Sequence, residues 1–109
     1  MNSVEGFFAY EIRVGTVVRA DAFPEARVPA FKLWIDFGPE IGEMTSSARI
    51  TDLYRAEDLV GRQVVCVTNF PPRQVGPFLS EVLVLGVETP QGVALLSVDR
   101  EVRNGSRIS

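Results

Sequence analysis

The amino-acid sequence predicts an all-β fold: a five-stranded barrel with a short helix between strands 3 and 4, and extra elements at the chain ends. Three observations support this prediction. The chain of 109 residues suits a single domain, residues 1–109, and its 46% hydrophobic content is enough for one core. Short strand-like runs recur and are separated by glycine and proline. Between the third and fourth runs, the residues become helix-favouring.

The first three predicted strands span residues 12–20, 31–37 and 44–50. Apolar and polar residues alternate in the second and third strands, which predicts one face toward the core and one face outward. The first strand alternates less regularly. Its alternation places Val18 on the inward face and Val17 on the outward face, together with the arginines. The outward residues are predicted to be Arg13, Gly15, Val17, Arg19, Lys32, Trp34, Asp36, Thr45, Ser47 and Arg49.

The pattern changes over residues 54–60, where residues 56–59 favour a short helix, and strands are predicted over residues 63–69, 81–86 and 93–98. Acidic Glu57 and Asp58 favour the first turn of the helix, and Gly61 suits a left-handed residue at its end. Residues 70–78 hold three prolines and are predicted to form a stiff loop. The order of elements is that of an OB-fold barrel. An SH3-like barrel, the main alternative, lacks the internal helix.

The side-chain chemistry of the sequence argues against catalysis. The chain has no histidine, so it lacks the commonest general base and the commonest metal ligand. Its single cysteine, Cys66, lies in an apolar run and is predicted to be a buried thiol. Neighbouring helical residues point about 100° apart, so Glu57 and Asp58 do not converge on a substrate. We therefore predict no enzyme activity, no metal site and no cofactor.

The charge and hydropathy of the chain bear on its partners and its location. The net charge of −3 does not favour a phosphate-rich partner, although a local basic face can coexist with it. No segment approaches the roughly 20 apolar residues of a membrane span. The first residues lack the basic start of a secretory signal. The sequence therefore predicts a cytoplasmic protein with no membrane insertion.

One candidate binding surface is the cationic outer face of the predicted strands 2 and 3. OB barrels usually bind ligands on this face and on the loops between strands 1–2 and 4–5. Basic residues and one tryptophan suit single-stranded nucleic acid through phosphate contact and base stacking. The candidate nucleic-acid-binding residues are Arg13, Arg19, Lys32, Ser47, Arg49 and Arg73. Simple solvation of the arginines and a subunit contact at Trp34 remain the alternatives.

The predicted loop at residues 70–78 indicates a second kind of ligand, an extended polypeptide. Its prolines lower the entropy cost of holding Phe70 and Phe78 ready for binding, and only Arg73 is basic there. The candidate peptide-binding residues are Phe70, Phe78, Phe31, Trp34, Pro71 and Pro72. The alternative is that Phe70 and Phe78 cap the end of the barrel core.

Several motifs, in order over nearly the whole chain, resemble the tRNA-binding domain of aminoacyl-tRNA synthetase appendages and free-standing tRNA-binding proteins. They are residues 11–15 (EIRVG), 24–26 (PEA), 46–51 (SSARIT), 80–85 (SEVLVL) and 104–107 (NGSR). Within that family, residues 23–30 (FPEARVPA), 69–73 (NFPPR) and 80–86 (SEVLVLG) resemble the CsaA-type export chaperones.

The resemblance to the chaperones implies binding of precursor proteins as they pass to the secretion machinery. It also implies a homodimer whose contacts involve the chain ends. The N-terminal aromatic residues independently need cover that a small barrel does not give. The candidate dimer-contact residues are Phe7, Phe8, Tyr10, Asn104 and Arg107.

Two functions therefore remain open. The first is an export-related chaperone that binds unfolded precursor polypeptides, favoured by the acidic net charge and the apolar loop. The second is a structure-selective tRNA-binding protein, favoured by the family resemblance and the basic residues. The tRNA-binding relatives have a more basic loop and a Ser-Gln pair where this chain has Ser80 and Glu81. Each lost positive charge weakens binding to phosphate.

Overall fold

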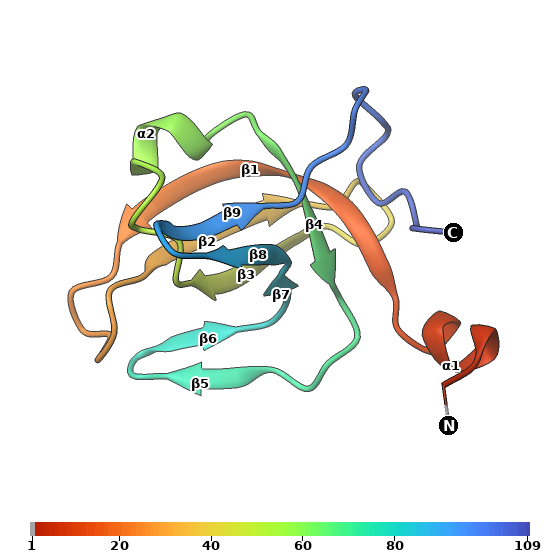
Figure 1. The fold of residues 1–109 in the computed structure, drawn as a ribbon, viewed down its shortest axis with the longest axis horizontal. Coiled ribbons are helices and arrows are strands. Elements are labelled where there is room, and N and C mark those ends of the chain that lie inside the picture. The colour runs from red at the N-terminus through yellow and green to blue at the C-terminus, as the bar shows by residue number, and fades with distance from the viewer. Residues whose placement is uncertain (1) are drawn as a thin grey trace.

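The structure, a computed structural model, describes residues 2–109 (Figure 1). Its main feature is an antiparallel five-stranded sheet, in the order β3-β2-β1-β4-β7, that curls into a nearly closed OB barrel. The strands are β1 (Ile12–Ala22), β2 (Phe31–Asp36), β3 (Glu43–Ala48), β4 (Gln63–Val67) and β7 (Leu83–Val84). The sheet edges meet where the backbone N–H groups of Glu81 and Val82 donate to the Thr45 carbonyl, at 2.8 and 3.1 Å. The all-β barrel predicted from the sequence is confirmed.

The short helix expected between the third and fourth strands is α2 (Ala56–Leu59). Leu59, its one buried residue, joins the barrel core and is 0% exposed. The helix covers the residues predicted for it, and Val60 after it is already extended. Gly61 follows with a φ of +91°, the left-handed conformation expected at that position.

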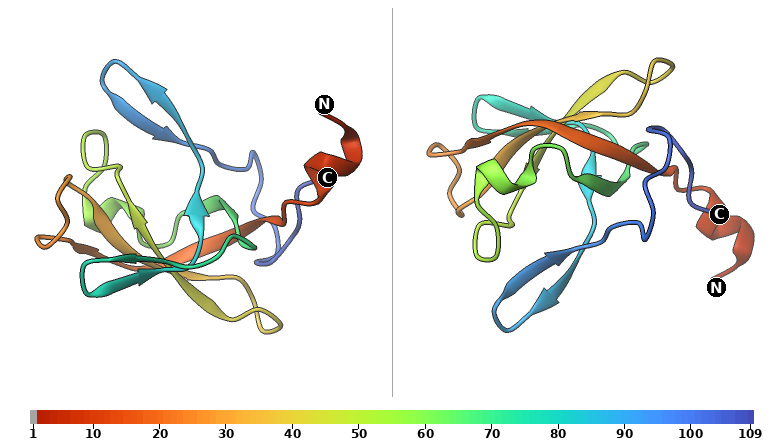
Figure 2. Two further views of the ribbon diagram at one scale, coloured as in Figure 1. Left: turned by 90° about the horizontal axis from the view of Figure 1, so that it is seen from below. Right: turned by 90° about the horizontal axis from the view of Figure 1, so that it is seen from above.

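Two hairpins and one helix lie outside the barrel sheet. The hairpins pair β5 (Arg73–Val75) with β6 (Phe78–Ser80), and β8 (Gly86–Thr89) with β9 (Gly92–Leu95). The β8–β9 hairpin projects away from the barrel in both views of Figure 2. Helix α1 (Val4–Phe8) begins at Ser3, whose hydroxyl accepts from the Gly6 N–H, and it lies on the same side of the barrel as the C terminus (Figure 1).

The barrel core draws apolar residues from β1, β2, β3, β4 and α2. Leu33, Ile35 and Phe37 are at most 1% exposed, which confirms the inward face predicted for the second strand. Gly15 of β1 lies directly against them. A Cβ atom at Gly15 would lie 2.6 Å from Ile35 Cγ2 and 2.8 Å from two atoms of the Phe37 ring. The close approach of β1 to this part of the core therefore requires glycine.

The faces predicted for the first strand are wrong at Gly15, Val17 and Val18. Gly15, predicted to face outward, is buried against the side chains of the core. Val17 is fully buried in the core, and Val18 is 44% exposed. The pairing register between β1 and β2 shifts between Val17 and Arg19. A β-bulge of this kind places two residues opposite one on the neighbouring strand and so breaks the strict alternation of faces. The irregular pattern noted in the sequence is the signal of this bulge.

The stiff loop predicted at residues 70–78 is instead partly a β-hairpin. Val75 pairs with Phe78 across a two-residue turn in which Gly76 adopts a φ of +55°. Phe70 precedes this hairpin, whereas Phe78 is part of it. The two phenylalanines that the sequence grouped together are therefore held by different parts of the fold.

Cys66 is a buried structural thiol, as predicted. It is 0% exposed, and burial raises the pKa of its thiol to about 12. Because the thiolate is the reacting species and a free cysteine ionises near pH 8.5, we expect an aromatic disulfide reagent at pH 8 to label the native protein at least about 100-fold more slowly than the denatured protein. The two labelling rates, followed by absorbance, check this, and similar rates would contradict the buried assignment.

Candidate binding groove

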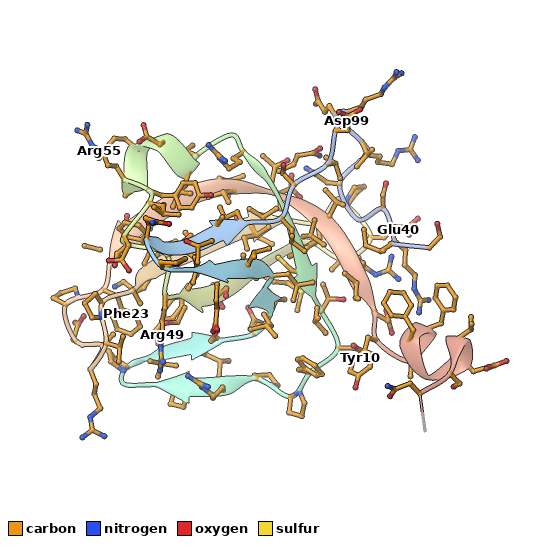
Figure 3. The ribbon with its side chains drawn as sticks, in the orientation of Figure 1. Tyr10, Phe23, Glu40, Arg49, Arg55 and Asp99 are labelled. Atoms are coloured by element: carbon orange, nitrogen blue, oxygen red, sulfur yellow. The ribbon has the colours of Figure 1, made fainter. Side chains whose placement is uncertain are left out.

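A groove of about 580 Å³ lies between the β5–β6 hairpin and the β8–β9 hairpin. Its volume is in the range of pockets that hold small ligands or short peptide segments. The groove is lined by the floor residues Ala48, Ile50, Val82 and Val84, by Phe70, Pro71 and Arg73 on one wall, by Gly86, Glu88 and Val93 on the other, and by Ser47 and Arg49 at the end of β3. Arg49 lies beside the β5–β6 hairpin in Figure 3.

This groove brings together residues that the sequence assigned to two different ligands. Phe70 and Pro71 were candidates for peptide binding, whereas Ser47, Arg49 and Arg73 were candidates for nucleic-acid binding. A peptide or a nucleic acid that binds in the groove would therefore contact both sets of candidate residues. The remaining candidates lie elsewhere.

Hydrogen bonds that involve side chains join β3 to residues 80–82, where the backbone does not form a continuous strand pairing. The Thr45 N–H and hydroxyl both donate to the Glu81 carboxylate, at 3.0 and 2.9 Å. The Ser47 N–H donates to the Ser80 hydroxyl at 2.9 Å, and the Ser46 hydroxyl donates to the Val82 carbonyl at 2.8 Å. Ser80 and Glu81 thus close the barrel and set the floor of the groove. The sequence identified this pair within a family motif and as a difference from tRNA-binding relatives, and not as a structural contact.

Phe78, Trp34 and Lys32 form a separate cluster with Phe23. The Phe78 ring packs edge-on against Phe23 and Trp34, with ring centroids 5.6 and 5.7 Å apart. The Lys32 ammonium lies 5.4 Å from the Phe23 centroid and 5.9 Å from the Phe78 centroid. Aromatic pairs and cation–π contacts of this kind are stabilising. This aromatic cluster therefore fastens the β5–β6 hairpin to the outside of the barrel, away from the groove lining.

Arg19 extends the aromatic cluster at its exposed edge. Its guanidinium lies 4.3 Å from the Trp34 ring centroid and donates twice to the Asp21 carboxylate, at 2.7 and 3.1 Å. The hydrogen bond and charge of Asp21 raise the pKa of Arg19 above its ordinary value. Arg19 thus has partners within the chain for both its charge and its planar face.

Arg13 and Asn104 connect the barrel to the C-terminal segment. Arg13 donates to the Gly105 carbonyl at 2.9 Å and forms an ion pair with Glu11 at 3.2 Å. Asn104 accepts from the Thr16 hydroxyl at 2.7 Å. Arg13, a candidate for nucleic-acid binding, and Asn104, a candidate for dimer contact, thus both form hydrogen bonds within the chain. Long-range pairing of β1 with the C terminus brings them together, and nothing in the local sequence indicates this pairing.

The N-terminal aromatic residues remain exposed. Phe7, Phe8 and Tyr10 are 43%, 41% and 47% exposed, and α1 buries no residue of its own. Arg107 donates to the Phe8 carbonyl at 2.6 Å, which ties the two chain ends together. The Tyr10 ring packs edge-on against Phe70, with centroids 5.7 Å apart. An apolar surface therefore runs from α1 to the rim of the groove.

Two further peptide-binding candidates lie outside the groove lining. Phe31 is half-buried and packs against the barrel core. Pro72 is exposed beside Pro71. Sequence reasoning in turn missed Gly86, Glu88 and Val93, because the β8–β9 hairpin reaches the groove only through the three-dimensional fold.

Two other kinds of site are absent from residues 2–109. Within this range, no group of three or more histidine, cysteine, aspartate or glutamate residues is placed to hold a metal ion. Among the helices of the same range, none has the length and apolar character needed to cross a membrane.

Residues 12–107 match a family model described as "Putative tRNA binding domain". Among solved structures, the chain is similar to the chaperone CsaA of Bacillus anthracis, with 52% identity, a TM-score of 0.92, and coverage of 100% of this chain and 99% of that one. It is also similar to the CsaA chaperone of Picrophilus torridus, with 43% identity, a TM-score of 0.95 and full coverage of both chains.

Curated relatives include much longer synthetases. The methionine–tRNA ligase of Methanocaldococcus jannaschii is 36% identical over 99 residues, which are 90% of this chain and 15% of that protein. The chain therefore spans about 15% of the length of this synthetase. The similarity concerns that one part of the synthetase.

Proposed function

We propose that this chain, which belongs to the tRNA-binding domain family and is homologous to the CsaA chaperones, binds unfolded precursor polypeptides in the groove as a cytoplasmic export chaperone. The observation that supports this most is the chemistry of the groove. Its floor is apolar, and Phe70 and Pro71 form part of one wall. Apolar surfaces with a few polar groups suit extended segments that have not yet buried their own side chains.

We propose binding without catalysis. Of the two carboxylates that line the groove, Glu81 is already engaged by the backbone and hydroxyl of Thr45. Glu88 stands on the opposite hairpin. The groove therefore offers contact surface, and the chaperone would release its client chemically unchanged.

Binding of tRNA is a second candidate function, because the family match and two groove arginines favour it. Arg49 and Arg73 lie on the same surface as Phe70, so a nucleic acid and a peptide would compete for it. Of the six candidate basic or polar residues, three line the groove, whereas Arg13 is engaged with the C-terminal segment and Lys32 with the aromatic cluster. This division favours the peptide.

A competition experiment at physiological salt tests the proposal. A labelled, unfolded precursor segment is bound to the protein, and bulk tRNA is titrated in while fluorescence anisotropy is followed. We expect the segment to bind and tRNA to displace it only weakly. No binding of the segment would contradict the chaperone function.

The same assay separates the two candidate ligands through charge. If tRNA binds in the groove, Arg49→Gln and Arg73→Gln should each lower the slope of log affinity against log salt by about 1, because each removes one phosphate contact. Asp99→Asn, which changes an exposed charge outside the groove, is the control. Unchanged slopes in both arginine variants would place any tRNA elsewhere.

We also propose that the chain forms a homodimer through the apolar surface at its ends. Phe7→Ser combined with Phe8→Ser is expected to give a monomer in sedimentation at micromolar concentration, where the unaltered chain sediments as a dimer. Since α1 has no buried residue, the thermal unfolding of the barrel should change little. A monomer mass for the unaltered chain would contradict this proposal.

A further inference from the structure

The β8 strand has one edge that pairs with no other strand of residues 2–109. Its register with β9 pairs Glu88 with Val93 and Gly86 with Leu95. Just beyond the hairpin, the Leu96 N–H donates to the Leu85 carbonyl at 3.2 Å. Opposed residues in antiparallel strands alternate between hydrogen-bonded and non-bonded pairs. The bond at Leu85 and Leu96 therefore makes the next pair, Gly86 with Leu95, a non-bonded one.

The same alternation directs the backbone N–H and C=O groups of Gly86 and Glu88 away from β9. The opposite side of the hairpin supports this phase, because the Leu95 N–H points away from β8 and donates to the Tyr54 hydroxyl at 2.9 Å. Within residues 2–109, no hydrogen bond to another element reaches the backbone of Gly86 or Glu88. The outward N–H of Leu95 in β9 thus has a partner, whereas the outward backbone groups of Gly86 and Glu88 have none within residues 2–109.

Gly86 and Glu88 are also the two β8 residues that line the groove. An unpaired strand edge is a template for another extended backbone. We infer that an extended polypeptide segment binds in the groove by adding to β8 as a third strand of the β8–β9 hairpin. This inference rests on the proposed peptide-binding function and specifies how the groove recognises its client.

The surroundings of the edge indicate the side chains that such a segment presents. Alternate side chains of an added strand would face the apolar floor at Ile50 and Val82. The intervening side chains would meet Arg49 and Arg73, for which residues 2–109 provide no ion-pair partner. The occupant is therefore an extended segment that alternates apolar residues with acidic or small polar ones. Main-chain pairing supplies affinity that depends little on the client's sequence.

Backbone methylation of a peptide tests the pairing directly on the unaltered protein. The probe is a nine-residue peptide that alternates valine with aspartate and serine, and two variants carry N-methyl groups either on the valines or on the intervening residues. Only one set of N–H groups faces β8, because N–H groups alternate along a strand with the side chains. We expect one methylated peptide to bind at least about tenfold more weakly, and the other to match the unmethylated peptide, since each lost hydrogen bond has a modest net effect.

Both methylated peptides binding as well as the parent would overturn the inference, because side chains alone would then account for binding. Equal losses in both would also overturn it, because they would report the altered conformation of the peptide and not a single paired edge. Failure of the unmethylated peptide to bind would instead contradict the proposed peptide-binding function itself.

A variant of the protein provides an independent test. Glu88→Pro removes the outward N–H but no bond of the hairpin, and proline is tolerated at the outward positions of edge strands. We expect Glu88→Pro to bind the unmethylated peptide about tenfold more weakly than Glu88→Ala, which loses the same carboxylate but keeps the N–H. Thermal unfolding verifies that both variants are folded. Equal binding by the two variants would overturn the inference.

Discussion

Phe37→Ala is expected to lower the free energy of unfolding by about 4 kcal/mol, the middle of the range for deleting a buried phenylalanine ring. The ring is 1% exposed and lies in the barrel core. It also occupies the space that Gly15 leaves open, since a Cβ at Gly15 would lie 2.8 Å from two of its atoms. Deleting the ring removes its apolar contacts and leaves a cavity beside β1 that the fixed strand pairing cannot close.

Chemical denaturation followed by circular dichroism measures this effect. Small domains have about 5–15 kcal/mol of stability in total, so the loss is a large share of it. Phe37→Leu keeps most of the apolar volume and should cost about 1 kcal/mol. Val18→Ala, at a position that is 44% exposed, should stay within about 0.5 kcal/mol of the unaltered protein. A Phe37→Ala variant as stable as Val18→Ala would contradict the assignment of Phe37 to the core.

The sequence predicted the parts of the fold that depend on local periodicity. In β2 and β3, apolar and polar residues alternate every second position, and the burial of Leu33, Ile35 and Ala48 follows that alternation. The helix α2 lies where the strand pattern stops. These elements are predictable because the period of two in a strand fixes which side chains share a face.

The sequence could not predict features that depend on irregular or distant pairing. The bulge in β1 reverses the alternation at Val17 and Val18, and only the partner strand fixes where it occurs. The Thr16 hydroxyl donates to the side-chain oxygen of Asn104, 88 positions further along the chain, so no local pattern indicates their contact. Arg13, which the sequence placed beside the outer face, is therefore engaged with the C-terminal segment instead.

The aromatic residues show the same limit within the binding site. The sequence grouped Phe70 with Phe78 because they frame one proline-rich segment. The turn at Gly76 instead folds Phe78 back onto Phe23 and Trp34, while Phe70 lines the groove and contacts Tyr10. The two residues thus acquire different roles: Phe78 holds the hairpin in place, and Phe70 is available to a ligand.

That division of roles makes Phe70→Ser the most informative substitution for binding. We expect it to weaken the affinity for an unfolded precursor segment by about 30-fold, which corresponds to the roughly 2 kcal/mol typical of a central aromatic contact. The side chain is 40% exposed and is packed edge-on against only one aromatic ring, that of Tyr10. Its removal should therefore leave the stability of the barrel nearly unchanged.

Two serine variants of the β5–β6 hairpin separate binding from folding. Leu79 is 45% exposed, belongs to the same hairpin and does not line the groove, so Leu79→Ser should bind peptide like the unaltered protein. Phe78→Ser should lower stability by about 1–3 kcal/mol, because it removes the ring that joins Phe23 to Trp34. Peptide affinity by fluorescence anisotropy and unfolding by heat are measured on all three. If Phe70→Ser binds as tightly as Leu79→Ser, peptide binding does not depend on this wall of the groove, and the exposed aromatic residues at the chain ends become the surface to test next.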